Sequence, residues 1–403
     1  MVNKKSINTN RSVVLISNLY PNNLETTKGL FIKQLANSLS NLCELTVVSP
    51  IPFHPLDLIR KASIVKEELI DGITVLHPRY IVIPKILRSL IGYFFSKGIY
   101  KTIKLLQQQG KADIISAHWT YPDGYGASLV AKKLRIPFSI HALGCDINDY
   151  TKYRIRKKLI IKALNSSNIN IVKSQALKDK ITSLGVDSNK TIVIHNGVDQ
   201  NKFVRKETLI ARKEIESASG KIDFDANTKY CLFIGNFQIE KGLNYLLDAF
   251  NKVKKENVHL IIIGSGPLQS EIESQIENLA LETFVTLLGR VEHQYIPQYM
   301  AACDLLCLPS LREGCPNVVL ESLSCGTPVV ASNVGAVPDI ISKEEFGVIV
   351  PACNAVNLAK GITKGIKLKE HKLPKFEWYD WKENAVRVND KLQKIRIKNL
   401  LTS

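Results

Sequence analysis

The chain lacks the sequence features of several common protein classes. No uninterrupted apolar run reaches the roughly 18 residues that suggest a transmembrane helix, and residues 1–10 are polar, without the apolar core of a secretory signal. None of the eight cysteines belongs to a Cys-x2-Cys pair or has a histidine at zinc spacing. We therefore expect a cytoplasmic protein whose cysteines are reduced.

Two cofactor motifs are missing from the places where they would act. No Gly-x-Gly-x-x-Gly follows the first predicted strand, which argues against a dinucleotide oxidoreductase. No Asp-x-Asp metal motif is recognised in the sequence, so neither a metal nor another cofactor is expected.

Acidic residues are scarce in one half of the chain only. Residues 1–200 contain 28 Lys and Arg against 13 Asp and Glu, whereas residues 201–403 contain 26 against 24. The basic half could face nucleic acid, an anionic membrane or an anionic substrate, and charge alone does not choose among them. Two basic stretches, residues 81–104 and 153–162, could lie on an anionic membrane or could be ordinary surface helices.

Strand-like and helical patterns alternate along both halves of the chain. The first half opens with a strand at 12–17 and a helix from about 29 to 39. After a polar stretch at 217–229, six further strand-like runs alternate with helical patterns. This alternation predicts two doubly wound, Rossmann-like α/β domains with parallel sheets. Ligands of such sheets bind at the carboxyl ends of the strands.

A loop, a helix and a strand follow the run that ends at Pro309. The predicted helix start would leave backbone amides of Gly314, Cys315 and Asn317 unpaired, and these could hold an anion. The carboxylates of Glu313 and Glu321 flank these donors, as a polyhydroxylated phosphate ester would require. Alternatively, one glutamate complements the helix dipole and the other is a solvated helix residue.

The complete pattern is more specific than its parts. Seven residues separate Glu313 from Glu321, with Gly-x-Pro between them and Gly-Thr-Pro-Val-Val after them. This resembles the signature of glycosyltransferase family 4, retaining enzymes of the two-domain GT-B fold. The resemblance implies that Glu313 holds sugar hydroxyls in catalysis, that Glu321 holds the ribose, and that the loop from Gly314 through Pro316 to Asn317 lies against the sugar phosphate.

Further family motifs follow other strands of the second half. Lys241 precedes a predicted helix, and the resemblance gives it the diphosphate, as a further catalytic residue. Asn236 stands where the family usually has arginine, which removes one expected phosphate cation. Gly264 and Gly266 form a tight turn of the kind that lets a ligand approach closely. The alternative for Lys241 is a solvated side chain in a turn.

The base of the donor nucleotide is expected beside the next strand end. The resemblance implies backbone contacts to the base from Arg290 and Val291, although the arginine could equally be a surface residue.

The first half carries weaker matches to the family. His141 and Asp146 resemble its His-Gly-x-Asp region with altered spacing, which gives His141 a catalytic place near the donor sugar. Asp146 and His118, which lies beside aromatic residues, are interpreted as acceptor-binding. Gly29 would let backbone approach the donor phosphates. A histidine that ends an apolar strand can also be purely structural.

The resemblance covers about residues 12–395 and completes the fold prediction. We expect GT-B, with an acceptor-side domain at 1–200, a linker at 201–228 and a nucleotide-sugar domain at 229–379. The two domains would face each other across a cleft. A C-terminal helix at 380–403 would cross back to the first domain.

The predicted function is transfer of a sugar from a nucleoside diphosphate sugar to a lipid-linked or saccharide acceptor. The chain looks most similar to bacterial teichuronic-acid or capsule-type transferases. The basic half suggests a peripheral position at the inner face of the cell membrane, and no nucleic-acid motif is present. A non-catalytic nucleotide-sugar or membrane-binding module of the same fold, a nucleic-acid binder, and a GT-B epimerase or phosphorylase are the alternatives.

Overall fold

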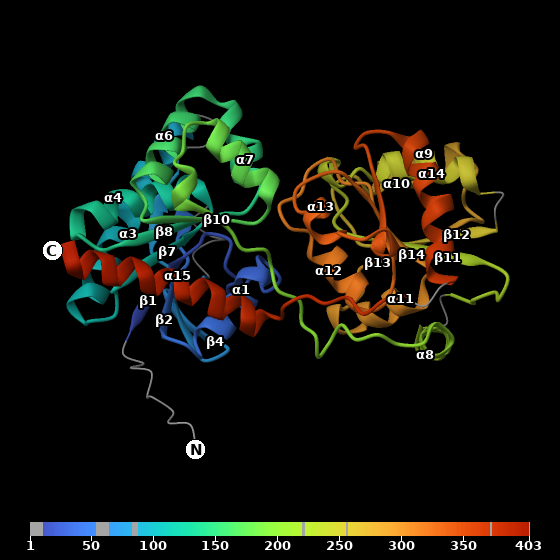
Figure 1. Ribbon diagram of the computed structural model, residues 1–403, viewed down its shortest axis with the longest axis horizontal. Coiled ribbons are helices and arrows are strands. Elements are labelled where there is room, and N and C mark those ends of the chain that lie inside the picture. The colour runs from blue at the N-terminus through green and yellow to red at the C-terminus, as the bar shows by residue number, and fades with distance from the viewer. Residues whose placement is uncertain are drawn as a thin grey trace, which may run out of the picture. The chain divides into compact units, whose positions relative to one another are not determined.

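The computed structural model describes residues 11–53, 64–82, 88–219, 222–254, 257–370 and 373–402. Contacts divide the chain into a first unit, Met1–Asn196 with Trp381–Ser403, and a second unit, Gly197–Asp380. Each unit is an α/β structure built on one large sheet (Figure 1). The predicted fold class is confirmed.

The first unit has an eight-stranded sheet in the order β10-β9-β8-β7-β1-β2-β5-β4. All neighbours are parallel except β4 and β5. The strands are β1 (Ser12–Ile16), β2 (Glu44–Val48), β4 (Glu67–Ile70), β5 (Ile73–Leu76), β7 (Ile114–His118), β8 (Phe138–Ala142), β9 (Ile169–Val172) and β10 (Thr191–Val193), with β3 (Ile51–Phe53) and β6 (Arg79–Ile81) in a separate pair.

Strand alternation in the first unit supplies two cores, one on each face of the sheet. Val14 and Ile16 belong to one buried cluster and Val13 and Leu15 to the other, as a period of two requires. The helices are α1 (Leu30–Leu39), α3 (Ile91–Gln108), α4 (Tyr125–Leu134), α5 (Cys145–Asn148), α6 (Arg154–Ser166), α7 (Gln175–Ser183) and α15 (Trp381–Thr402).

The C-terminal helix returns to the first unit, as predicted. Trp381, Ala385 and Val388 of α15 are buried in the same cluster as Leu35 and Leu39 of α1, and the two helices lie side by side in Figure 1.

The second unit has a six-stranded, fully parallel sheet in the order β13-β12-β11-β14-β15-β16. The strands are β11 (Lys229–Ile234), β12 (Val258–Ile263), β13 (Val285–Gly289), β14 (Leu305–Leu308), β15 (Val329–Ser332) and β16 (Gly347–Val350). The helices are α8 (Thr208–Ser219), α9 (Leu243–Val253), α10 (Gln269–Asn278), α11 (Ile296–Ala302), α12 (Asn317–Ser324), α13 (Val337–Ile340) and α14 (Ala355–Ile366).

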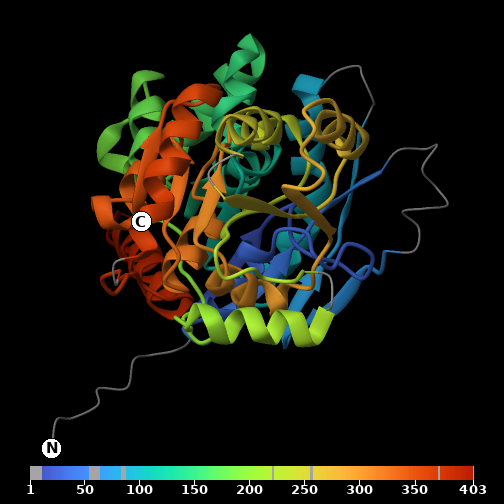
Figure 2. The same cartoon turned by 90° about the vertical axis from the view of Figure 1, so that its right-hand side faces the viewer.

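Two features were not anticipated from the sequence. Residues 201–228, expected as a linker, contain α8, which packs against α11 in the second unit and runs along its edge in Figure 2. In the first unit, β4 and β5 form an antiparallel hairpin through Asp71 and Gly72, both at positive φ. An Asp-Gly pair with this geometry matches a two-residue hairpin turn.

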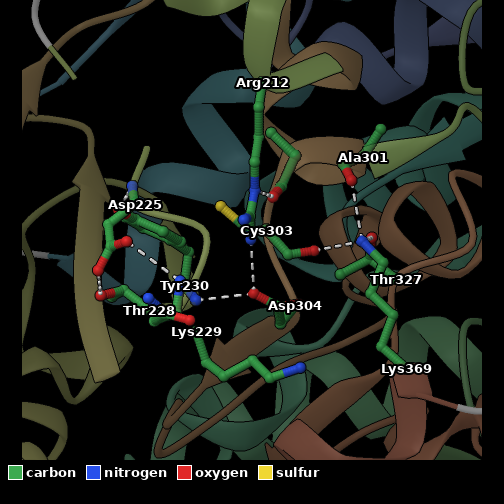
Figure 3. Close-up of polar contacts among 12 residues, drawn as sticks. Arg212, Asp225, Thr228, Lys229, Tyr230, Ala301, Cys303, Asp304, Thr327 and Lys369 are labelled. Atoms are coloured by element: carbon green, nitrogen blue, oxygen red, sulfur yellow. Dashed lines mark hydrogen bonds and ion pairs between the residues drawn. The ribbon is translucent and has the colours of Figure 1, made fainter. Parts of the chain in front are cut away.

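A buried ion pair fixes α8 to the sheet. Asp304 accepts hydrogen bonds from Arg212 of α8 at 2.9 Å and from the backbone of Tyr230 at 2.8 Å (Figure 3). Arg212 also donates to the Ala302 carbonyl at 3.0 Å. Both charged side chains are largely buried, because only 8% of Arg212 and 7% of Asp304 is exposed.

Among the described residues, none of the helices combines the length and the apolar character that a membrane span requires.

We predict that Asp304→Ala lowers the free energy of unfolding by about 3–5 kcal/mol, because it leaves the Arg212 charge buried without its partner. The measurement is urea denaturation. Glu383→Ala, which breaks the exposed Arg387–Glu383 pair at 2.7 Å, is the control and should change stability by less than about 1 kcal/mol. Equal effects of the two substitutions would contradict a structural role for the buried pair.

Candidate active site

The residues predicted for the second unit all lie at or beyond the carboxyl ends of its strands. Asn236 and Lys241 follow β11, Gly264 and Gly266 follow β12, and Arg290 follows β13. The loop after β14 carries Glu313 and leads into α12, which carries Glu321. Because the sheet is fully parallel, these strand ends share one edge.

Backbone packing explains the two glycines after β12. A Cβ on Gly264 would lie 1.9 Å from the carbonyl oxygen of Gly235, and one on Gly266 would lie 2.5 Å from that of Phe237. Gly264 also has φ +145°, which side chains rarely adopt. The turns after β11 and β12 therefore touch directly, and only glycine fits at their contact.

Glu313 is held by side chains from two strand ends. Its Oε1 accepts hydrogen bonds from Lys241 Nζ at 2.7 Å and from Ser310 Oγ at 2.8 Å. The Glu313 side chain is 11% exposed. A second pair, Arg312 with Glu240 at 3.0 Å, joins the same two loops. The structure thus brings together the two second-unit residues predicted as catalytic.

The loop before α12 packs against the backbone of Gly335 and Ala336. Gly335, at φ +56°, leaves no room for a side chain, since a Cβ there would lie 2.5 Å from the Glu313 carbonyl and 2.7 Å from that of Gly314. Ala336 N–H donates to the Gly314 carbonyl at 2.9 Å. Pro316 precedes the first turn of α12, and that turn contains no acidic residue. Cys315 is partly exposed beside it.

Glu321 lies near two residues that the sequence analysis did not select. His293 Nε2 is 3.8 Å from Glu321 Oε1, and Nδ1 of the same ring contacts Lys202 Nζ. Burial lowers the pKa of Lys202, and the Glu321 carboxylate opposes this shift. No spacing in the sequence points to these two residues, because they come from separate loops.

Three further residues of the second unit were predicted as donor-binding: Arg290, Val291 and Asn236. Arg290 Nε donates to Ser265 Oγ at 2.6 Å, which ties the ends of β12 and β13 together. Val291 packs against the hydrophobic core, and Asn236 is exposed.

The predicted histidines of the first unit form a buried pair. The rings of His118 and His141 are stacked with centroids 3.8 Å apart. Burial lowers the pKa of His118 to about 3 and that of His141 well below its usual value, and the Lys173 charge adds to both shifts. Both rings are therefore neutral near pH 7.

The Asp146 carboxylate is hydrogen-bonded to backbone amides. It accepts from the amides of Thr120 at 2.8 Å, Leu143 at 3.0 Å and Gly144 at 2.8 Å. Burial raises its pKa, and these amides oppose the shift. Asp146 is 0% and His118 1% exposed. Their acceptor-binding role stays a prediction.

Two further residues organise the first unit's strand ends. Gly29, at φ +56°, precedes α1, and a Cβ there would lie 2.0 Å from the Leu19 carbonyl. Asp123, which the sequence analysis did not select as a site residue, is fully buried and accepts from the Asn18 amide at 2.6 Å. Burial raises the pKa of Asp123 well above its usual value.

The sequence analysis recognised no Asp-x-Asp metal motif, and this statement needs correction. An Asp-x-Asp sequence does occur at Asp223 to Asp225, in the turn before β11 and so at the opposite end of that strand. Asp225 caps this turn through Asn227 N–H at 3.1 Å and Thr228 Oγ1 at 2.9 Å. Within the described ranges, no three or more His, Cys, Asp or Glu residues gather as metal ligands.

Two family models match successive parts of the chain. The one described as Glycosyltransferase Family 4 matches residues 29–202, and the one described as Glycosyl transferases group 1 matches residues 214–376. The chain therefore combines a glycosyltransferase family 4 domain with a glycosyl transferases group 1 domain. It is therefore a glycosyltransferase, as the sequence analysis predicted.

A curated relative and two solved structures are also similar to this chain. A putative teichuronic acid biosynthesis glycosyltransferase, TuaC, from Bacillus subtilis is 28% identical over 87% of this chain and 88% of its own length. Sucrose-phosphate synthase from Thermosynechococcus elongatus superposes with a TM-score of 0.74 at 19% identity, over 96% of this chain and 99% of its own. Anabaena HepE in complex with UDP gives 0.72 at 20% identity, over 95% and 100%. The two solved structures support the GT-B fold.

We predict that Lys241 and Glu313 are energetically coupled by about 1–2 kcal/mol, since their hydrogen bond is charge-assisted and mostly shielded from water. The measurement is a double-mutant cycle of Lys241→Ala and Glu313→Ala, read from urea denaturation. The Arg312–Glu240 pair, whose side chains are 30% and 39% exposed, provides a control cycle with weaker coupling. Additive effects of the first two substitutions would contradict the pairing.

Proposed function

We propose that this family 4 enzyme is a retaining glycosyltransferase that uses a nucleoside diphosphate sugar and glycosylates a lipid-linked or saccharide acceptor in surface polysaccharide biosynthesis. The observation that supports it best is the Glu313 carboxylate, held by Lys241 and Ser310 where two strand ends meet the start of α12. This arrangement combines hydroxyl acceptors, a cation and helix amides, which are the groups a sugar diphosphate needs.

The family resemblance supplies the roles within this proposal. Glu313 binds hydroxyls of the transferred sugar, Lys241 and the amides that begin α12 bind the diphosphate, and Glu321 binds the ribose. The departing diphosphate accepts the proton of the incoming hydroxyl on the same face of the sugar. The main catalytic task is then to stabilise the negative charge that develops on the leaving group.

The names of similar proteins support the substrate class. The TuaC relative is named for teichuronic acid biosynthesis, which is consistent with a polysaccharide acceptor here. HepE was solved with UDP, and the shared fold makes a uridine nucleotide the first donor to test.

We predict that one nucleotide class among UDP, GDP and ADP sugars raises the melting temperature of the protein. At a hundred times the dissociation constant, the ligand should stabilise the fold by about 2.7 kcal/mol. Glu321→Ala should lose this response, because the ribose loses its carboxylate partner. The measurement is a thermal-shift panel on both proteins.

An exposed glutamate provides the matched control for this panel. Glu345→Ala removes a carboxylate from the exposed turn before β16 and should keep the full response. No response of the native protein to any donor, or a full response of Glu321→Ala, would contradict the proposed donor site. Product formation with retained anomeric configuration, followed by NMR, tests the stereochemistry.

A basic face of the first unit supports a peripheral position on an anionic membrane, which is part of the same proposal. The N-terminal ends of α3 and α6 meet at Tyr121, whose hydroxyl accepts from the Gly92 amide at 3.1 Å and whose ring lies 6.0 Å from the Arg156 guanidinium. Tyr153 and Ile155 there are 57% and 59% exposed.

The positive charge at the start of α6 is not balanced within the helix, although Arg156 lies over the rings of Tyr150 and Tyr153 at 5.1 and 4.9 Å. Arg154, Arg156, Lys157 and Lys158 occupy its first turns and α6 contains no acidic residue, although the helix dipole disfavours cations at that end. Exposed apolar side chains next to cations that no acidic residue of α6 balances match an anionic lipid surface.

We predict that the protein sediments with vesicles containing phosphatidylglycerol, and that binding weakens as salt is raised. The paired change of Tyr153→Ser and Ile155→Ser should weaken binding about tenfold, because two apolar side chains no longer enter the interface. Leu69→Ser is the control, since Leu69 is 71% exposed but lies on β4. Equal binding to neutral vesicles, or an equal effect of the control, would contradict this proposal.

A further inference from the structure

Ser116 stands at the centre of a buried polar cluster in the first unit. Ser116 pairs with Ser139, and His118 with His141, in the register of the parallel strands β7 and β8. Residues two apart on a strand share a face, so the four side chains meet on one side of the sheet. All four are buried, with at most 1% of any residue exposed.

The Ser116 hydroxyl contacts three partners at once. Its Oγ lies 3.3 Å from His118 Nε2, 3.1 Å from His141 Nε2 and 3.2 Å from Ser139 Oγ. A hydroxyl has one proton to donate and two lone pairs to accept with. All three contacts can therefore be satisfied only if Ser116 donates once and accepts twice.

The count of protons then distinguishes the two rings. If Ser139 donates to Ser116, one histidine must donate its Nε2–H to Ser116 and the other must accept the Ser116 proton at Nε2. The first ring then has a bare Nδ1, and the second carries its proton on Nδ1. The alternative, in which both rings donate, turns the Ser116 proton toward Ser139 and leaves the Ser139 hydroxyl proton unpaired in a buried place.

The proton count assumes that both histidine rings are neutral, and their surroundings support this. Burial keeps the pKa of both histidines below the neutral range, and Lys173, itself 3% exposed, is the cation that reinforces this effect. A neutral imidazole has one donor and one acceptor nitrogen, so the partner of one nitrogen fixes the role of the other.

We propose that Ser116 is a positioning residue that holds His118 and His141 as opposite neutral tautomers, and so sets whether Nδ1 of His141 donates or accepts a hydrogen bond. Nδ1 of His141 is buried and has no hydrogen-bond partner in the described part of the chain. It lies near the carboxyl end of β8, where ligands of such sheets bind.

The ligand of His141 rests on the proposed function and on the family resemblance, which implies a place for this residue near the donor sugar. A sugar hydroxyl both donates and accepts, so it can pair with either tautomer of the ring. A phosphate oxygen accepts only, and it would pair only with a ring that carries its proton on Nδ1.

The test is NMR of the ring nitrogens in 15N-histidine-labelled protein without any substrate. His118→Gln and His141→Gln assign the two buried rings among the eight histidines of the chain. We expect one ring protonated on Nε2 and the other on Nδ1, unchanged between pH 6 and 8. Two rings of the same tautomer, or a ring that becomes protonated in this range, would overturn the proposal.

Two serine variants separate the role of Ser116 from ordinary packing. Ser116→Ala should change the tautomer of at least one ring, whereas Ser139→Ala removes a hydroxyl of the same cluster without touching either ring. Unchanged tautomers in Ser116→Ala would also overturn the proposal. If this variant does not fold, the native spectrum still decides, because it reports both tautomers directly.

Turnover provides a second readout once a donor is known. Ser116→Ala should lower kcat on the order of tenfold and leave the donor KM within about twofold, as expected when ground-state binding is unchanged. Equal kcat in Ser116→Ala and the native enzyme would contradict a positioning role. The tautomers need no turnover, so a failure of the proposed function and a failure of this proposal give different results.

Discussion

The site of this enzyme depends on close backbone contact between neighbouring turns of parallel sheets. All strands of the second unit end at one edge, so the turns that follow them must share limited space. Gly264 meets the Gly235 carbonyl there, and Gly335 meets the carbonyls of Glu313 and Gly314. A side chain at any of these contacts would push the loops apart and move Glu313 away from Lys241.

The same constraint is met differently in the first unit. There the strand ends are joined by buried carboxylates that accept backbone amides, Asp123 from Asn18 and Asp146 from Thr120 and Gly144. A buried carboxyl is tolerated only when such donors compensate its lost hydration. Both carboxyl groups therefore connect neighbouring loops through hydrogen bonds. This explains why Asp146, whose position in a family motif suggests substrate contact, is turned into the protein.

Features that depend on local patterns along the chain could be predicted from the sequence. Strand and helix alternation predicted both sheets apart from the β4–β5 hairpin, and Glu313 and Glu321 were selected as candidates because they lie within one short signature. Contacts between distant loops carry no such pattern, which is why Lys202 and His293 beside Glu321 were missed. The helix α8 was missed because its neighbourhood in the sequence is polar. Its position depends on contacts between residues far apart in the chain, which are the Arg212–Asp304 ion pair and the burial of Ala211 and Ile215 in the core of the second unit.

Pairing of Lys241 with Glu313 has a consequence for donor binding. In the proposed donor site, a diphosphate beside Lys241 would share the ammonium group with a carboxylate 2.7 Å away, and the two anions would repel each other. Lysine is suited to this task because its three donors can serve both partners. Asn236 would add no second cation there, so the proposal assigns more of the negative charge to the amides that begin α12. Under this proposal, oriented backbone dipoles would stabilise much of the charge that develops as the diphosphate leaves, and such dipoles need no rearrangement during the reaction.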